Sequence, residues 1–289
     1  MPVSFPIIDT HVHFWDSEHL DYGWLRGSEL LNRPYLPGDY TEAIGPVRVE
    51  KVVFVEAGAP AKAAMPEVQW VTQLAKQDKR IQAIVASAPL ERGDGVKADL
   101  ETLAQNPLVK GIRPRFPGGG EPPSPFVEGV HLLASIGFSC DVCVRWERLP
   151  AAIDLVRRCP DVRFMLDHIG VPNIREQKLD PWRAHLRDLA ALPNVCCKMS
   201  GVATTADREH WQPDDLEPAI HHVIDCFGFE RTAFGSDWPV MLLATTYPRW
   251  VEALAWAVRG CSEAELRRLF RETASAFYRL NAGPDATAS

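Results

Sequence analysis

The chain has 289 residues, of which 46% are hydrophobic, and it carries a formal net charge of −7 at pH 7. This length suits one large globular domain with a substantial core. The acidic balance argues against nucleic acid as a partner, and no apolar run reaches the roughly 18 residues of a membrane span.

The first residues show no basic segment followed by an apolar one, so we expect no secretory signal. In that setting the seven cysteines are interpreted as reduced thiols of a cytoplasmic protein. A homo-oligomer is compatible with this composition, but the number of subunits cannot be read from the sequence.

Apolar, β-rich runs alternate with amphipathic stretches along the chain. We expect eight strands, at residues 6–13, 51–56, 81–86, 109–115, 138–145, 163–168, 194–200 and 232–237. Apolar residues at three- and four-residue spacing predict helices over 66–79, 96–105, 149–159 and 214–227. Further helix starts are indicated by Asp180-Pro181 and by a capping box at Ser262 to Glu265.

This alternation predicts parallel strands joined by crossover helices, which is an α/β fold. Eight repeats favour a closed (β/α)8 barrel, the TIM barrel, over an open sheet. We therefore expect a single domain over residues 1–289, with a frayed tail at 281–289. Two connections are long, at 14–45 and 202–215, and both follow strands at the carboxyl end of the barrel.

Aromatic side chains in such loops are typical of substrate walls, although each could equally pack against the barrel rim. We assign Trp24 in the first loop and Trp238 after the last strand to substrate binding.

Histidines and an aspartate stand at the ends of three predicted strands. His11 and His13 share one strand face, and alternation also points His168 and Asp237 inward. The carboxyl ends of barrel strands carry the chemistry of this fold, so we favour function over a structural role for all four. Neutral imidazole and carboxylate bind zinc and also serve as acid–base groups, so all four are candidate catalytic residues and, if a metal is bound, its candidate ligands.

Charged residues end several other strands. Arg113 is predicted to contact substrate, because a guanidinium fork matches a carboxylate or a polarised carbonyl. For Arg115 an inward and a loop position are equally supported. Glu56, Lys198 and Arg145 are further candidates for substrate binding, and their alternative is a salt bridge at the strand ends.

Two features resemble functional motifs without meeting their requirements. Cys140 and Cys143 have metal-knuckle spacing, but residues three apart on a strand face opposite sides and no second pair follows. We expect core packing for these and for Cys196 and Cys197. The glycines at 118–120 precede prolines, so they predict a flexible loop instead of a phosphate cradle.

Three ordered motifs resemble the amidohydrolase superfamily, and more specifically its amidohydrolase-2 branch of sugar lactonases. They are His11-Val12-His13, Leu166-Asp167-His168 and the run Gly235-Ser236-Asp237-Trp238-Pro239. The segments 21–24, 35–37, 198–201 and 211–216 are similar to L-fuconolactonase and L-rhamnonolactonase relatives. The resemblance spans nearly the whole chain.

The resemblance implies a (β/α)8 barrel with His11, His13, His168 and Asp237 at its site. Binuclear members of the superfamily also use a lysine after the fourth strand and a histidine after the fifth. Here those places hold Arg113 and the pair Val144-Arg145. The resemblance therefore implies one divalent metal, with zinc expected, or none, as in the metal-independent 2-pyrone-4,6-dicarboxylate lactonase.

The function that follows is hydrolysis of a sugar-derived lactone, such as L-fucono- or L-rhamnonolactone, to the free acid. Asp237 is the predicted general base, and the histidines, Arg113 or zinc would polarise the carbonyl. The alternatives are a lyase or isomerase on the same barrel, a hydrolase of a pyrone or dicarboxylate lactone, and a binding protein without turnover. The expected partner is a small-molecule lactone.

Overall fold

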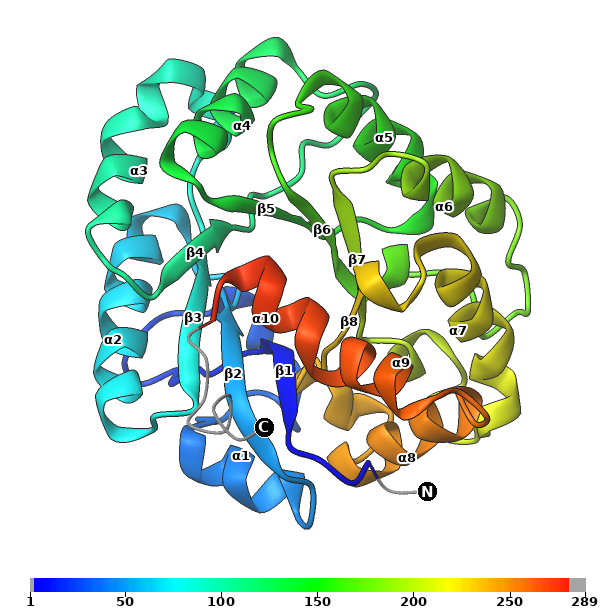
Figure 1. Cartoon of the computed structure of the whole chain (residues 1–289). Coiled ribbons are helices and arrows are strands. Elements are labelled where there is room, and N and C mark those ends of the chain that lie inside the picture. The colour runs from blue at the N-terminus through cyan, green and yellow to red at the C-terminus, as the bar shows by residue number, and fades with distance from the viewer. Residues whose placement is uncertain (1–2, 281–289) are drawn as a thin grey trace, which may run out of the picture.

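The computed structural model describes residues 3–280, and its strands form one parallel sheet in the order β1 to β8. The (β/α)8 prediction is confirmed, with helices outside a ring of strands (Figure 1). The strands are β1 (Ile7–Val12), β2 (Val49–Val55), β3 (Ile81–Ala86), β4 (Val109–Ile112), β5 (Ser139–Val142), β6 (Phe164–Leu166), β7 (Val195–Met199) and β8 (Thr232–Phe234).

Most of these strands end earlier than predicted, because the functional residues that follow them leave the sheet. Residues 113–115 after β4, 143–145 after β5 and 235–237 after β8 all lie beyond the last paired residue. The carboxyl ends are therefore short loops that aim side chains over the barrel mouth.

The ring closes between β1 and β8, the first and last strands. The backbone N–H of Asp237 donates to the carbonyl of His11 at 2.8 Å, and that of His13 donates to Trp238 at 2.8 Å. The buried carboxylate of Asp9 strengthens this seam by accepting from the backbone N–H groups of His11 at 3.1 Å and Ser236 at 2.8 Å. The two fragments most distant in sequence thus become hydrogen-bonded neighbours.

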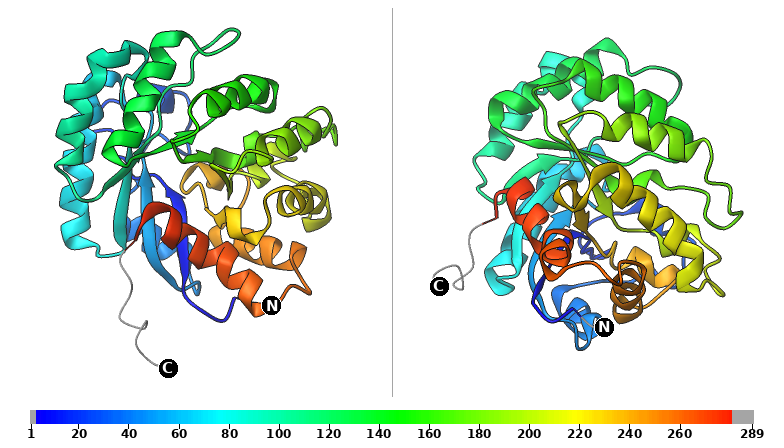
Figure 2. Two further views of the ribbon diagram at one scale, coloured as in Figure 1. Left: turned by 45° about the horizontal axis from the view of Figure 1, so that its top comes forward. Right: turned by 45° about the vertical axis from the view of Figure 1, so that its right-hand side comes forward.

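Eight helices cover the outside of the ring (Figures 1 and 2). They are α1 (Pro37–Ile44), α2 (Ala64–Gln77), α3 (Lys97–Ala104), α4 (Ser124–Ile136), α5 (Leu149–Arg158), α6 (Trp182–Ala190), α7 (Pro213–Phe227) and α8 (Tyr247–Ala257). The four helices predicted from periodicity are confirmed within two residues. The helix start predicted at Pro181 lies one residue later, at Trp182, and no bounds were predicted for α1, α4 and α8.

A C-terminal helical segment closes the other end of the barrel. It consists of α9 (Glu263–Arg267), the π-helical turn Arg268–Glu272 and α10 (Thr273–Tyr278), and α10 lies across the ring of strands in Figure 1. The predicted capping box is confirmed, since Ser262 Oγ accepts from Glu265 N and Ser262 N donates to the Glu265 carboxylate. Phe277 and Tyr278 pack with side chains that line the barrel interior.

Part of that interior is a narrow apolar layer. It contains Ile8, Val53, Val55, Ala83, Val85, Met165 and Ala233, while a larger cluster fills the space between strands and helices. Within residues 3–280 no helix is both long and apolar enough to cross a membrane. The predicted frayed tail at 281–289 lies outside the described residues.

Candidate active site

Two histidines form the centre of the site, His11 in β1 and His13 directly after it. Their Nε2 atoms lie 3.2 Å apart, and both side chains are almost fully buried. The Nδ1 atom of His13 lies 2.8 Å from the carbonyl of Val55 at the end of β2. This contact requires a proton on Nδ1, so the Nε2 atom of His13 presents a lone pair to the site.

Asp237 completes this cluster from the loop after β8. Its Oδ1 atom lies 3.4 Å from Nε2 of His13 and 3.7 Å from Nε2 of His11. Asp237 has a φ of 65°, a left-handed conformation that L residues rarely adopt outside constrained sites. Gly235 allows the close approach, because a Cβ there would lie 2.9 Å from the His11 Cβ atom.

His168 reaches the site as predicted, but a turn after β6 places it there and not the alternation of side chains along the strand. The inward residue of β6 is Met165, so alternation along this strand would point His168 outward, contrary to the prediction. After Leu166 the chain turns, and His168 adopts a φ of 52°. The turn brings its Nε2 atom to 3.9 Å from Asp237 Oδ1, with Nδ1 3.0 Å from Ser200 Oγ.

These groups fit a divalent metal. His11, His13 and Asp237 each offer one ligand atom, and the three separations are 3.2, 3.4 and 3.7 Å. Tetrahedral zinc ligands at 2.0–2.2 Å from the ion lie roughly 3.3–3.5 Å from one another. Two nitrogens and a carboxylate oxygen therefore converge at zinc-like spacing. Asp167 faces Nδ1 of His11 at 3.4 Å, as second-shell carboxylates do in zinc sites.

Arg113 brings a positive charge to the same point. Its Nε donates to Glu56 Oε1 at 2.7 Å, and its Nη2 donates to the carbonyl of Glu56. These two bonds fix the guanidinium and leave Nη1 directed at the site, 3.4 Å from His11 Nε2. Glu56 is held in turn by the backbone N–H of Gly58 at 2.7 Å.

Beneath the histidines lies a buried ionic chain that sequence reasoning missed. The amino group of Lys198 lies 2.6 Å from Asp141, 3.0 Å from Asp167 and 3.3 Å from Nδ1 of His11. Tyr278 from α10 donates to Asp141 at 2.7 Å. Lys198 and both carboxylates are fully buried, so the chain connects the closed end of the barrel with the histidine centre.

Burial controls the proton affinities of the cluster. It lowers the pKa of His13 to about 3, and the charge of Arg113 adds to that effect. It also lowers the pKa of His11, which the carboxylate of Asp167 offsets in part. Burial raises the pKa of Asp237 to about 6, against the opposing charges of His168 and Arg113. The imidazoles are thus neutral at neutral pH, which is the form that binds metals.

Other predicted substrate contacts lie elsewhere than expected. Lys198 is enclosed in the ionic chain, and Trp238 is fully buried against Phe14, Tyr35 and Tyr40, so neither side chain is exposed at the mouth. Trp24 is 46% exposed and donates its indole N–H to the carbonyl of Ala57 at 2.7 Å, beside the Glu56 loop.

The other two predicted arginines, Arg115 and Arg145, lie in the loops that follow β4 and β5. Arg115 donates to the carbonyl of Ala59 at 3.2 Å, and Arg145 is exposed with a 3.5 Å ion pair to Glu147. Cys140 packs in the core as predicted, but Cys143 is exposed, so core packing is wrong for that thiol. It lies just beyond β5, where the chain has left the sheet.

Glu67 from α2 gives a stability prediction near the Glu56 loop. Burial raises the pKa of Glu67 to about 8, the charge of Glu56 adds to it, and the backbone N–H of Ala57 donates to Oε1 at 3.2 Å. Between its ordinary value of 4.5 and about 8 the folded protein holds a proton that the unfolded chain releases. The free energy of unfolding therefore falls as pH rises through this window, by at most about 1.4 kcal/mol per pH unit.

Glu67→Gln removes this penalty, so its stability relative to the wild type is expected to increase from pH 5 to pH 9. Urea denaturation at several pH values measures the difference. A difference that stays constant with pH would contradict the assignment of a protonated Glu67.

A family model for amidohydrolases matches residues 8–280. The chain belongs to the amidohydrolase family. An L-fucono-1,5-lactonase from Burkholderia multivorans is 32% identical over 295 residues, covering 96% of this chain and 98% of that protein. An L-fucono-1,5-lactonase from Burkholderia ambifaria is 30% identical over 285 residues, covering 95% of this chain and 96% of its own. The predicted resemblance is confirmed.

Solved structures share the fold, and one of them contains zinc. The crystal structure of an amidohydrolase from Burkholderia multivorans with bound zinc is 31% identical, with a TM-score of 0.85 and coverage of 96% of this chain and 100% of that one. A probable 2-pyrone-4,6-dicarboxylic acid hydrolase from Acinetobacter baumannii shares the fold at 14% identity and a TM-score of 0.77, covering 96% and 100%.

Proposed function

We propose that this amidohydrolase opens the ring ester of a sugar-derived lactone to the free acid. The proposal rests mainly on one observation: a carboxylate and a guanidinium fixed by hydrogen bonds lie beside the same histidine. Asp237 Oδ1 and Arg113 Nη1 lie 3.7 and 3.4 Å from the same atom, His11 Nε2. The L-fucono-1,5-lactonase relatives support an aldonolactone such as L-fucono- or L-rhamnonolactone.

Lactone hydrolysis adds water to the ring carbonyl, and Asp237 is the proposed base for that water. Asp237 is only 5% exposed, so bulk water does not compete for the proton that its carboxylate accepts. The ring oxygen then leaves as an alkoxide and must recover a proton, which the protonated Asp237 can return. One carboxylate thus serves both halves of the reaction.

Arg113 is the proposed donor to the developing oxyanion. Its Nε and Nη2 are bound to Glu56, so Nη1 needs no reorganisation as negative charge appears. His11, His13 and Asp237 would hold a zinc ion, which when bound polarises the carbonyl or lowers the pKa of water. His168, oriented by Ser200, lines the remaining side of the cluster.

A pH-indicator screen over aldono-, aldaro- and pyrone lactones tests the proposal. We expect saturable acid release from at least one sugar lactone, with the ring-opened acid as the sole product by NMR. Release of CO₂, or a rearranged lactone, would replace hydrolysis with the decarboxylase or isomerase alternative. Binding without turnover across the panel would indicate a protein that has lost catalysis.

Metal content is a separate prediction. Purified protein is expected to carry about one zinc ion per chain, and His13→Ala should reduce this to a small fraction because a ligand is lost. Elemental analysis measures both, with His131→Ala on α4 as the control. Full activity after exhaustive chelation, with no metal found, would contradict the zinc prediction and leave Arg113 to polarise the carbonyl.

The cysteines are relevant to where the enzyme works. All seven are free thiols in the described structure. Persistent thiols support the proposal of a reducing, cytoplasmic setting.

A further inference from the structure

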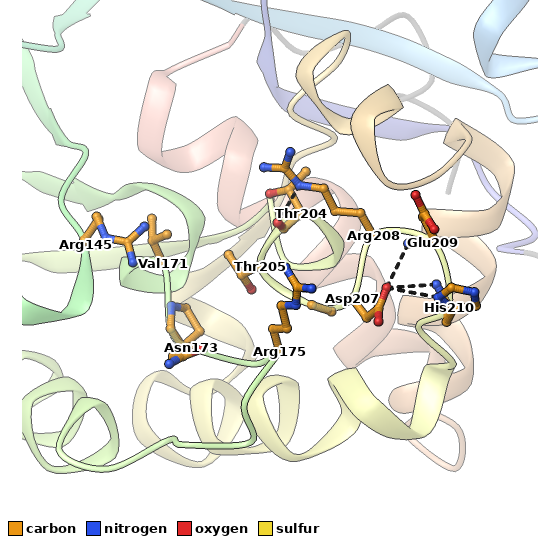
Figure 3. A pocket seen from close by; sticks show the side chains of 12 residues that line it. Arg145, Val171, Asn173, Arg175, Thr204, Thr205, Asp207, Arg208, Glu209 and His210 are labelled. Carbon is orange, nitrogen blue, oxygen red and sulfur yellow. Dashed lines mark hydrogen bonds and ion pairs between the residues drawn. The ribbon is translucent and has the colours of Figure 1, made fainter.

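A cavity of about 660 Å³ lies among the loops that follow β5, β6 and β7. Its walls come from three loops, which supply Arg145 after β5, residues 171–175 after β6 and residues 204–210 after β7 (Figure 3). Val171, which lines the cavity, donates its backbone N–H to the carbonyl of His168 at 2.8 Å, so one wall is hydrogen-bonded to a site residue. Its volume lies within the range of small-molecule pockets.

The cavity is preformed. Arg175 N donates to the carbonyl of Thr205 at 2.9 Å, which joins the β6 loop to the β7 loop. Arg208 Nε donates to the carbonyl of Thr204 at 3.3 Å, and Thr204 Oγ1 donates to Gly201 at 2.7 Å. The walls are therefore linked to each other and to the strand end that carries Ser200.

Three arginines give the cavity its charge. Within residues 3–280 the Arg175 guanidinium has no hydrogen-bond or ion-pair partner, and the sole ion pair of Arg145 is the 3.5 Å contact with Glu147. Figure 3 shows Arg145, Arg175 and Arg208 reaching the cavity from separate loops. In a chain of net charge −7, such a concentration of cations is a local reversal of sign.

The lining also holds the two carboxylates of Asp207 and Glu209, so three arginines leave it with a formal charge of +1. Asp207 already accepts from the backbone N–H groups of Glu209 at 3.1 Å and His210 at 3.2 Å, and lies 3.4 Å from the His210 ring. Glu209 is exposed at the outer edge. Arg145 and Arg175 remain as available guanidinium donors, with Thr205 and Asn173 as neutral hydrogen-bonding groups beside them.

We propose that this cavity binds an acidic substituent of the lactone, a carboxylate or a phosphate monoester, while the ring ester lies over Asp237. The inference rests on the proposed lactonase function, but it replaces L-fucono- and L-rhamnonolactone, which carry no anionic group, with acidic sugar lactones as the substrate class. A neutral lactone offers guanidinium groups no anion, whereas a carboxylate or phosphate matches the two-pronged geometry of arginine. The loops after β5, β6 and β7 would therefore recognise the anionic group, whereas Asp237 and Arg113 would perform the hydrolysis.

Paired lactones of equal ring configuration test this assignment with the intact, metal-loaded protein. The neutral members are galactono- and glucono-1,4-lactone and glucono-1,5-lactone. Galactaro- and glucaro-1,4-lactone form the carboxylate arm, and 6-phosphoglucono-1,5-lactone forms the phosphate arm. We expect kcat/KM at least about 10-fold higher for the acidic member of a pair in one of the two arms, the gain expected from charge-assisted hydrogen bonds.

Arg175→Gln should remove most of this preference, lowering kcat/KM about 10-fold or more for the acidic lactone and less than about 2-fold for the neutral one. Arg187→Gln on the outer face of α6 makes the same charge change away from the cavity, and should leave both values unchanged. Equal or better turnover of the neutral lactones, with no selective effect of Arg175→Gln, would overturn the proposal and leave lactonase function intact.

Failure of the proposed function gives a different result. If no lactone is hydrolysed, calorimetric titration with galactarate and 6-phosphogluconate still reports on the cavity. Binding that Arg175→Gln weakens about 10-fold would support the anion site without lactonase chemistry, and no binding of either anion would overturn it.

Discussion

Asp237→Asn is expected to lower kcat by roughly 10²- to 10⁴-fold, the usual contribution of a general base. The amide has almost the same shape as the carboxylate but cannot accept the proton of the attacking water. The backbone bond from Asp237 N to His11 does not depend on the side chain. The seam between β1 and β8 should therefore stay closed, and the circular dichroism spectrum and thermal midpoint should match those of the wild type.

Two measurements make this result specific to the base. Asp154→Asn removes a carboxylate that pairs with Arg158 on the surface of α5, and it should keep normal kcat. Zinc content measured on the same samples separates loss of the base from loss of a ligand. An Asp237→Asn protein with near-normal kcat would disprove the assignment.

The strand ends predicted which residues meet, although the strands are not regular there: the register of β1 shifts between Asp9 and Val12, and Asp237 lies beyond β8 with a φ of 65°. His11, His13 and Asp237 were correctly brought together from residues more than 220 positions apart, because parallel strands share one carboxyl edge. On β6 strand alternation predicted the wrong face. His168 arrives through a left-handed turn whose φ no periodicity encodes, and Asp167, its neighbour, has the parity of the inward Met165.

The ionic chain could not be predicted because its members come from distant elements. Lys198 was recognised as a strand-end charge, and the salt-bridge alternative describes it better than substrate contact. Asp141 lies between Cys140 and Cys143, whose spacing resembles a metal-binding pair, and nothing in the sequence links it to Lys198. Its partner Tyr278 lies on α10, and only the tertiary packing of that helix under the barrel shows that it reaches β5.

Lys198→Met is expected to cost about 3–5 kcal/mol in the free energy of unfolding, the typical penalty for breaking a buried ion pair from one side. The amino group lies between Asp141 and Asp167, and all three side chains are fully buried. Burial opposes ionisation of Asp167, but the charge of Lys198 is strong enough to hold the pKa of that carboxyl well below its ordinary value. Methionine would fill the space and leave two carboxylates without their cation.

Chemical denaturation of a matched set tests this cost. Lys178→Met breaks an exposed pair with Glu176, 2.9 Å long in the structure, and should leave the unfolding midpoint nearly unchanged. Adding Asp141→Asn to Lys198→Met should restore part of the lost stability, because one of the two uncompensated charges disappears. A Lys198→Met protein as stable as the Lys178→Met control would mean that the buried carboxylates are neutral.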